Sequence, residues 1–160
     1  MKKRTYFHDY RGGGWPELKW LEHFFLTAAG RKQAFGEQES WGLKIDGLDG
    51  TEHLQPYKDR IDLNLTIQGD LDHGILLWYN KSGGGHWEAK YSKGDPTKWR
   101  EWVETVQGDQ MSVALFVPFE VAWKAVKEFI ERDGALPRCI EWIADKDLPD
   151  YAFRPDLAAS

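Results

Sequence analysis

The residues best suited to chemistry lie in one short stretch near the middle of the chain. The segment from Trp78 to Tyr91 reads WYNKSGGGHWEAKY, so three glycines and a histidine separate two aromatic-rich runs. A glycine-rich run beside lysine and serine can hold a phosphate, and histidine can ligate a metal. The aromatic residues could instead form a box for a sugar, or the segment could be two strands joined by a turn.

The residue order excludes the phosphate site. A P-loop carries its Lys-Ser after the glycines, at the start of a helix, whereas KSGGG has them first and is followed by strand-like alternation. The three glycines at positions 83–85 are therefore predicted to supply the positive φ angles that a hairpin turn requires.

Histidines and carboxylates lack the spacing of metal ligands. The histidines form no i, i+4 pair and no HExxH motif, and they stand at positions 8, 23, 53, 73 and 86. Asp70, Asp72 and His73 come together in DLDHG, but at a strand-to-strand turn, where Asp and Gly are expected anyway. We predict no metal site and no cofactor.

The single cysteine, Cys139, indicates neither a disulfide framework nor a nucleophile. No catalytic signature surrounds it, and it lies within a predicted strand, so we expect it to be buried and inert. The chain also lacks GxSxG and a dinucleotide-binding fingerprint. We therefore expect a protein that is not an enzyme.

Composition and charge narrow the class further. The 160 residues are enough for one domain with a substantial core, and nine tryptophans suggest that some aromatic rings serve contact. Residues 1–35 carry seven Lys and Arg against three Asp and Glu, while residues 37–73 carry nine acids against three bases. This acidic segment favours a basic partner over nucleic acid. Because no apolar run resembles a signal peptide or a membrane span, we expect a cytoplasmic protein without membrane contact.

The elements that position these residues can be read from periodicity. We predict a single α+β domain over residues 1–160, with a mainly antiparallel, twisted sheet of about five to six strands. Two helices, at about 16–29 (with Gly30 as its stop) and 118–132, pack on one face. Predicted strands cover about 41–45, 61–68, 75–80, 86–92, 111–117 and 136–143. Residues 95–107 remain open between helix and strand, with a short helix near 96–100 followed by a strand favoured. Residues 1–14 are expected to be an irregular arm, and 145–160 an acidic, loosely ordered tail.

Alternation also assigns faces. In the 86–92 strand it groups Trp87, Ala89 and Tyr91 on one face, which we predict to be core, and His86, Glu88 and Lys90 on the other. Likewise, one of Trp78 and Tyr79 must face away from the core.

The second half of the chain resembles a known family. VPFEVAWKAVKEFIERDGALPRCIEW is similar to the ending of the Imm1 family of bacterial immunity proteins, with a strand, a Val-Pro step, an amphipathic helix ending near Gly, and a Trp in the last strand. The matching positions are Val117, Pro118, Ala122, Ala125, Phe129, Gly134, Pro137, Ile140 and Trp142. The preceding GILLWYNKSGGGHWEAKYSKGD resembles the family's central hairpin, so the resemblance spans about residues 61–143.

The resemblance implies a small protein that binds a cognate secreted toxin and blocks its active site. The toxins of such families include nucleic-acid deaminases and nucleases, whose basic clefts an acidic inhibitor could fill. We expect a monomer or a 1:1 complex with the toxin. The expected contacts are Asp70, Asp72, Trp78, Tyr79, His86 and Glu88.

A second hypothesis stays open on the residues alone. Trp78, His86, Trp87 and Glu88 could surround a pocket of a ligand-binding module or small enzyme, with carbohydrate stacked on the tryptophans. A concave pocket at these residues would favour this hypothesis, and a flat or convex surface would count against it.

Overall fold

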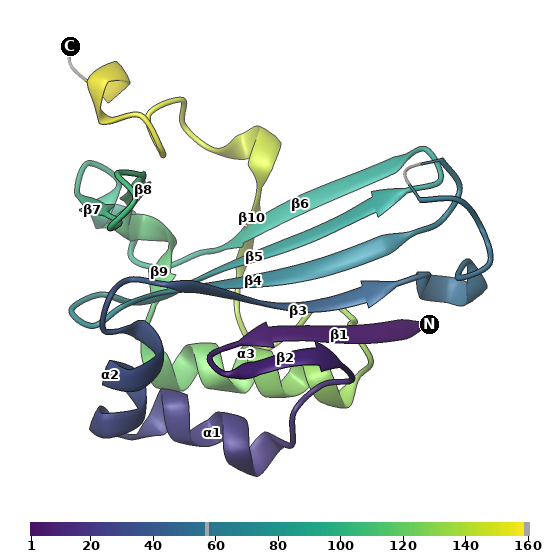
Figure 1. The fold of residues 1–160 in the computed structure, drawn as a ribbon. Helices are drawn as coiled ribbons and strands as arrows, with labels where there is room; N and C mark the ends of the chain where they lie inside the picture. Colours follow the sequence, from purple (N-terminus) through teal and green to yellow (C-terminus); the bar gives the residue numbers. More distant parts are fainter. Residues whose placement is uncertain (57, 159–160) are drawn as a thin grey trace.

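A computed structural model describes residues 1–56 and 58–158 of the chain, and it confirms a mainly antiparallel α+β fold (Figure 1). In this described part, the main sheet has eight strands in the order β10-β6-β5-β4-β3-β1-β2, while β9 pairs with the beginning of β5. The sheet is thus larger than predicted. Its strands are β1 (Lys2–Phe7), β2 (Tyr10–Gly13), β3 (Ser40–Asp46), β4 (Asp62–Asp70), β5 (Gly74–Gly83), β6 (His86–Ser92), β9 (Phe116–Val117) and β10 (Trp142–Ala144).

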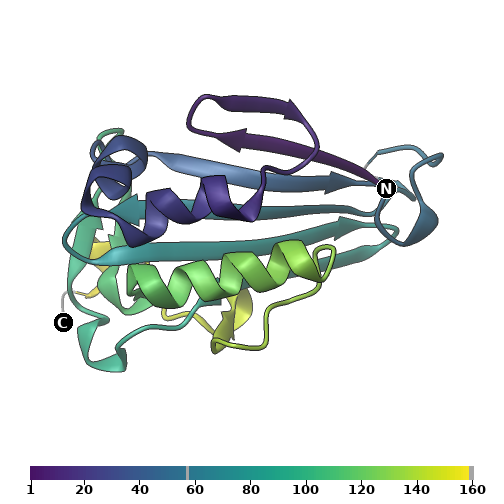
Figure 2. The ribbon, with the colours of Figure 1, turned by 90° about the horizontal axis from the view of Figure 1, so that it is seen from below.

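Helices cover one face of the sheet, as predicted. They are α1 (Leu18–Leu26), α2 (Ala28–Phe35) and α3 (Phe119–Glu131), and α1 and α3 lie side by side over the sheet, roughly along its strands (Figure 2). Alternate residues of the central strands, such as Leu65 and Leu77, point toward these helices and are fully buried. Phe25, Val126 and Phe129 meet them from the helices, so burial of large apolar side chains fixes this layer.

The helix predicted over 16–29 is two helices. Thr27 leaves the helical region (φ −118°, ψ 146°), ends α1, and caps α2 by accepting a 2.9 Å hydrogen bond from the Gly30 N–H. Gly30 is therefore inside α2 and does not stop the helix. A Cβ at this position would lie 2.0 Å from the His23 carbonyl oxygen, so glycine is needed because the two helices meet so closely.

The first 14 residues are ordered into a hairpin, contrary to the expected irregular arm. Strand β1 pairs with β3, with Thr5 opposite Leu43, and β2 pairs with β1 at the sheet's edge. Phe7 is fully buried among the rings of the helix layer. Alternation of polar and core-facing residues over only six positions was too short a signal to predict this strand.

The opposite face of the sheet also carries a core, at one end. A small sheet of β7 (Trp102–Glu104) and β8 (Gln110–Ser112) lies over it together with the C-terminal segment. Here the predicted strand 111–117 is broken, because Val113–Leu115 form a 3₁₀ turn between β8 and β9. The favoured assignment for 95–107 is confirmed, since a 3₁₀ helix over Pro96–Lys98 precedes β7.

Residues 145–158 of the predicted loose tail are held by the fold, and residues 159–160 lie outside the described part of the chain. The Trp102 indole N–H donates to the Tyr151 carbonyl at 3.0 Å, and the Ser112 N–H donates to that of Ala152 at 2.8 Å. Ala152 is buried, and the Phe153 ring lies 5.3 Å from that of Tyr91. Apolar residues separated by prolines were read as disorder, but they pack as an irregular cover.

The last predicted strand, 136–143, shrinks to the three residues of β10. The segment before it is a loop, and Cys139 in that loop is exposed, so the expected burial of this cysteine is wrong. No helix of the described residues is long and apolar enough to cross a bilayer.

Replacing Gly30 with alanine tests the crossing of α1 and α2. The added methyl group would press on the His23 carbonyl, so we expect the Gly30→Ala variant to lose about 1–3 kcal/mol of unfolding free energy in urea denaturation. Gly13→Ala is the matched control, because a Cβ there meets nothing within 4 Å and Gly13 has no positive φ. Equal stability of the two variants would contradict the close crossing.

Candidate functional site

The six predicted contact residues lie in four different places. Asp70 and Asp72 are at the β4–β5 turn, while His86 and Glu88 are at the far end of the β5–β6 hairpin. Nine paired residues of β4 and β5 separate these ends, which is roughly 30 Å along the strands. Trp78 and Tyr79 lie between them on opposite faces of β5. The structure therefore brings together two pairs but not all six.

Asp70 is a buried anchor of its turn. Its carboxylate accepts hydrogen bonds from the Gln38 side chain (2.9 Å), the Asp72 and His73 main-chain N–H groups (3.2 and 3.0 Å) and the His73 ring (2.6 Å). Burial by itself raises the pKa of Asp70, but the bonds from Gln38 and His73 outweigh it, and the pKa is lowered. The contact with Gln38 ties the loop after α2 to this turn.

Tyr79 belongs to the helix side of the sheet and is buried. Its hydroxyl donates to the Gly134 carbonyl at 2.9 Å. Desolvation, with the nearby charges of Glu88 and Asp49, raises the pKa of Tyr79 to about 12. The hydroxyl therefore stays protonated and donates a hydrogen bond to the chain that follows α3.

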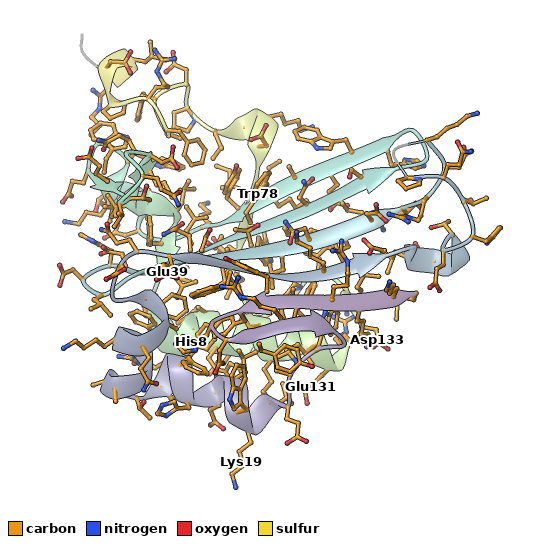
Figure 3. The ribbon with its side chains drawn as sticks, viewed as in Figure 1. His8, Lys19, Glu39, Trp78, Glu131 and Asp133 are labelled. Carbon is orange, nitrogen blue, oxygen red and sulfur yellow. The ribbon has the colours of Figure 1, made fainter. Side chains whose placement is uncertain are left out.

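Trp78 is the residue of this pair that faces away from the helices, as Figure 3 shows. Its ring stacks in parallel on Tyr91 of the neighbouring strand, with centroids 5.7 Å apart. Its indole nitrogen has no hydrogen-bond partner within the described chain. The ring closes the border of the second core and is not presented to solvent as an anchor.

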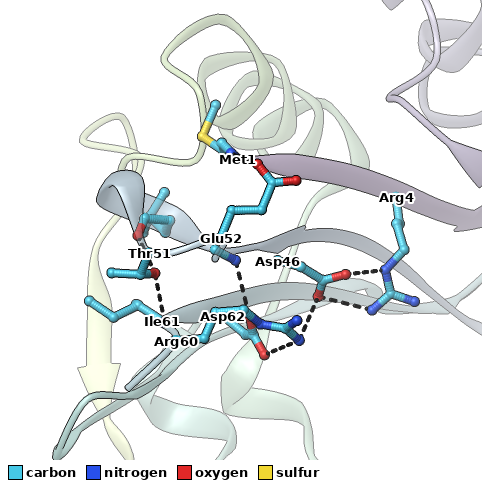
Figure 4. Close-up of polar contacts among 10 residues, drawn as sticks. Met1, Arg4, Asp46, Thr51, Glu52, Arg60, Ile61 and Asp62 are labelled. Carbon is cyan, nitrogen blue, oxygen red and sulfur yellow. Dashed lines mark hydrogen bonds and ion pairs between the residues drawn. The ribbon is translucent and has the colours of Figure 1, made fainter. Parts of the chain in front are cut away.

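Several acids of the segment 37–73 are paired with bases in the fold. Asp46 accepts from Arg4 at 2.6 Å and lies 3.9 Å from Arg60, which also binds Asp62 at 2.9 Å (Figure 4). Glu52 pairs with the amino terminus. Two groups of the basic N-terminal segment, Arg4 and the amino terminus, thus pair with Asp46 and Glu52 of the acidic segment.

Uncompensated acids remain at the end of the sheet that carries the β4–β5 turn. We call Glu37, Glu39 and Asp72 the acidic end; all three are exposed and have no ion-pair partner among the residues described. Beside them lies a hollow of about 360 Å³ that also reaches Val106, which is 74% exposed. Figure 3 places Glu39 at this end.

The opposite end carries the most exposed aromatic ring of the described chain. Gly84 and Gly85 (φ 57° and 78°) form the two-residue turn that the sequence predicted. We call His86, Trp87 and Glu88, which follow it, the hairpin surface. Trp87 is 63% exposed, although it was predicted to be core.

Trp87 was predicted to be core because its side of the strand was identified correctly but the extent of the core on that side was not. Trp87 does share a face with Ala89 and Tyr91, as alternation predicted, but that face is turned away from the helices. The C-terminal segment covers only the Tyr91 end of it. The sequence signal that could have identified Trp87 as exposed is its position next to the glycine turn.

Two hollows flank Trp87, and both have mixed charge. The first, about 370 Å³, is shared with Ala144–Lys146, and the second, about 320 Å³, with Asp49 and Lys81. Glu88 lies 3.3 Å from Lys90, and Lys81 lies 3.8 Å from Asp49. No group of three or more His, Cys, Asp or Glu within residues 1–56 and 58–158 is placed to hold a metal.

Replacing Asp70 with asparagine tests the anchor role. The lowered pKa means that the carboxylate stabilises the fold above about pH 4, where the unfolded state also ionises, and that this contribution is lost as the pH falls through the folded-state pKa. We expect Asp70→Asn to cost about 2 kcal/mol at pH 7 and progressively less in acid, by urea unfolding. Asp72→Asn, at an exposed neighbour, should change stability by less than about 0.5 kcal/mol. If Asp70→Asn lowers the free energy of unfolding by the same amount at every pH, this role of the carboxylate is contradicted.

Comparison with known proteins identifies the family. The family model described as Immunity protein Imm1 matches residues 36–144. This range begins directly after α2 and ends with the last residue of β10. It therefore includes most of the main sheet, α3 and the hairpin surface. No curated protein and no solved structure matches the chain significantly. Because the family match covers well over half of its length, the chain belongs to the Imm1 family of immunity proteins.

Proposed function

We propose that this protein is a non-enzymatic inhibitor that binds a cognate secreted toxin in the cytoplasm and blocks it by covering its active site. Membership of the immunity-protein family supports a toxin as the partner. The observation that carries the proposal for a surface is Trp87, a large aromatic ring left exposed on β6 near the edge of the sheet, where β6 pairs with β5. Tryptophan is among the residues that most often dominate protein–protein interfaces.

The surroundings of Trp87 suit an interface. His86 and Glu88 flank it, and the hollow on each side could receive a side chain of the partner. A six-pair ladder with β5 holds the hairpin, so little conformational entropy would be lost on binding. Of the expected contacts, His86 and Glu88 therefore stay in the proposal as direct contacts, while Asp70 becomes a positioning residue.

The acidic end has a different role in the proposal. Exposed carboxylates there, on a protein of net charge −5, would attract a toxin whose active-site cleft is basic. Such long-range attraction speeds encounter more than it slows dissociation. Asp72 is thus proposed to act on the association rate.

The carbohydrate hypothesis has less support. Trp78 is stacked on Tyr91, which lies four residues along β6 from Trp87, and neither hollow beside Trp87 is lined by Trp78, so the two rings do not share a pocket. The two hollows beside Trp87 are lined by side chains of both charges and by a single tryptophan ring, which fits a protein partner better than a stacked sugar.

Co-expression with the toxin domain encoded by the adjacent gene tests the function itself. We expect the two proteins to co-purify in a 1:1 ratio and the inhibitor to rescue growth of cells that make the toxin. Failure of both would contradict the proposal, and heat-stabilisation by an oligosaccharide without toxin binding would favour the alternative.

Trp87→Ala tests the anchor. We expect toxin affinity to fall about 30-fold or more, mainly through faster dissociation in surface plasmon resonance, because a hot-spot ring contributes at least about 2 kcal/mol. The melting temperature should hold, since this ring packs on no core residue. Leu71→Ala, which removes an apolar residue exposed at the other end, is the control and should bind normally. If Leu71→Ala weakens toxin binding more than Trp87→Ala does, the interface lies at the acidic end instead.

Charge reversal tests the acidic end. The double variant Glu39→Lys/Asp72→Lys changes the net charge from −5 to −1, and we expect several-fold slower association at low salt with an unchanged dissociation rate. The difference should vanish above about 0.5 M salt, where screening is strong. An increased dissociation rate would instead show that these acids touch the toxin.

A further inference from the structure

We propose that the free outer edge of β6 receives an extended segment of the toxin as an additional antiparallel strand. The inference rests on the proposed function and specifies how the hairpin surface is used. It concerns main-chain groups, so it is separate from the contribution of the Trp87 ring.

The edge of β6 is covered over only half of its length. Strand β10 pairs with it at three positions, Trp142 with Ser92, Ile143 with Tyr91 and Ala144 with Lys90. After Ala144 the chain turns away into a 3₁₀ helix over Asp145–Asp147. No described strand lies outside residues 86–89, and Figure 1 shows β6 continuing beyond β10 along the open side of the sheet.

Ladder geometry shows which main-chain groups this edge offers. The Lys93 N–H donates outward to the Glu141 carbonyl at 3.1 Å, and outward groups recur at every second residue of an antiparallel strand. The same parity points the main-chain groups of Tyr91, Ala89 and Trp87 outward. Tyr91 faces β10 and Ala89 is buried at the wall of the first hollow, whereas Trp87 is open to solvent. Trp87 therefore presents both an N–H and a carbonyl to a partner strand.

The first hollow lies where such a strand would sit. Its lining comes from both faces of the sheet, with Trp87 and Ala89 on one side and Glu88 and Lys90 on the other. Because residues from both faces of the sheet line it, this hollow must lie beside the edge of the sheet and not over one of its faces. Asp145 and Lys146 close it at the end of β10, so an added segment would continue the row that β10 begins.

The edge also specifies the chemistry of the segment. A residue opposite Trp87 would point to the same side as the indole ring, which favours an apolar side chain. The residue next to it would lie opposite Glu88, whose charge is already met by Lys90 at 3.3 Å, so the edge asks for no particular charge there. The occupant that this edge specifies is therefore an extended toxin segment with an apolar side chain opposite Trp87.

A second copy of this chain is a poorer occupant. In a symmetric antiparallel pair centred on Trp87, the turn residues Gly84 and Gly85 of one copy would lie opposite Lys90 and Ala89 of the other. The place opposite Lys90 is already taken by Ala144. The free edge is therefore long enough for a separate segment but not for a second hairpin of the same kind.

Amide hydrogen exchange of the full chain, alone and with the toxin domain from the adjacent gene, tests the inference. We expect the Trp87 amide to exchange fast in the free protein and at least tenfold more slowly in the complex. The Glu88 amide points toward Lys81 of β5 and serves as the internal reference, protected in both states. Toxin binding without slower exchange at Trp87 would overturn strand addition.

A matched pair of variants gives an independent readout. Trp87→Ala and Trp87→Pro both remove the ring, but only proline removes the outward N–H, which the β5–β6 ladder does not use. We expect Trp87→Pro to bind the toxin about 3- to 10-fold more weakly than Trp87→Ala, because one further hydrogen bond is lost. Equal affinities of two folded variants would overturn the inference, and if Trp87→Pro does not fold the amide measurement decides.

The outcomes separate the two proposals. If the wild-type chain does not bind the toxin at all, the proposed function fails and strand addition fails with it. If the toxin binds and Trp87→Ala weakens binding, but the Trp87 amide remains unprotected, the function stands and only the strand-addition mode is wrong.

Discussion

Strand β5 carries apolar side chains on both of its faces. Ile75, Leu77 and Tyr79 point toward the helices, while Leu76 and Trp78 point the other way. Burying both sets from water requires a cover on each side of the sheet. The helices supply one cover, and β7, β8 and the C-terminal segment supply the other over one end only. The partial second cover leaves residues 86–88 of β6 outside both apolar cores.

The strands that alternate strongly were predictable, and so was α3. Ile61, Leu63, Leu65 and Ile67 showed the face of β4, and the Pro118–Gly134 punctuation bounded α3. The break at Thr27 was not predictable, because the apolar spacing continues through it and only the tight crossing at Gly30 requires two helices. The second core was missed for a similar reason: its cover is irregular chain without periodicity.

The candidate site was predictable in part. The glycine turn and the outward direction of one residue of the Trp78–Tyr79 pair followed from local pattern. The sequence predicts Asp70 as a contact because a surface acid and an acid that organises a turn have the same sequence signature. Only its hydrogen bonds to Gln38 and His73 distinguish the two. The exposure of Trp87 depends on where the tail stops, which is a tertiary property.

The uncovered end of β6 contributes little to the packing of the fold, so under the proposed function it is available for recognition. Between the turn and Ala89, residues 86–88 contribute nothing to either apolar core, and their pairing with β5 uses main-chain bonds that most side chains permit. Sequence changes there can accumulate at little thermodynamic penalty to the scaffold. Under the proposed function, these three residues can change to match a changing toxin while the sheet that carries them stays the same.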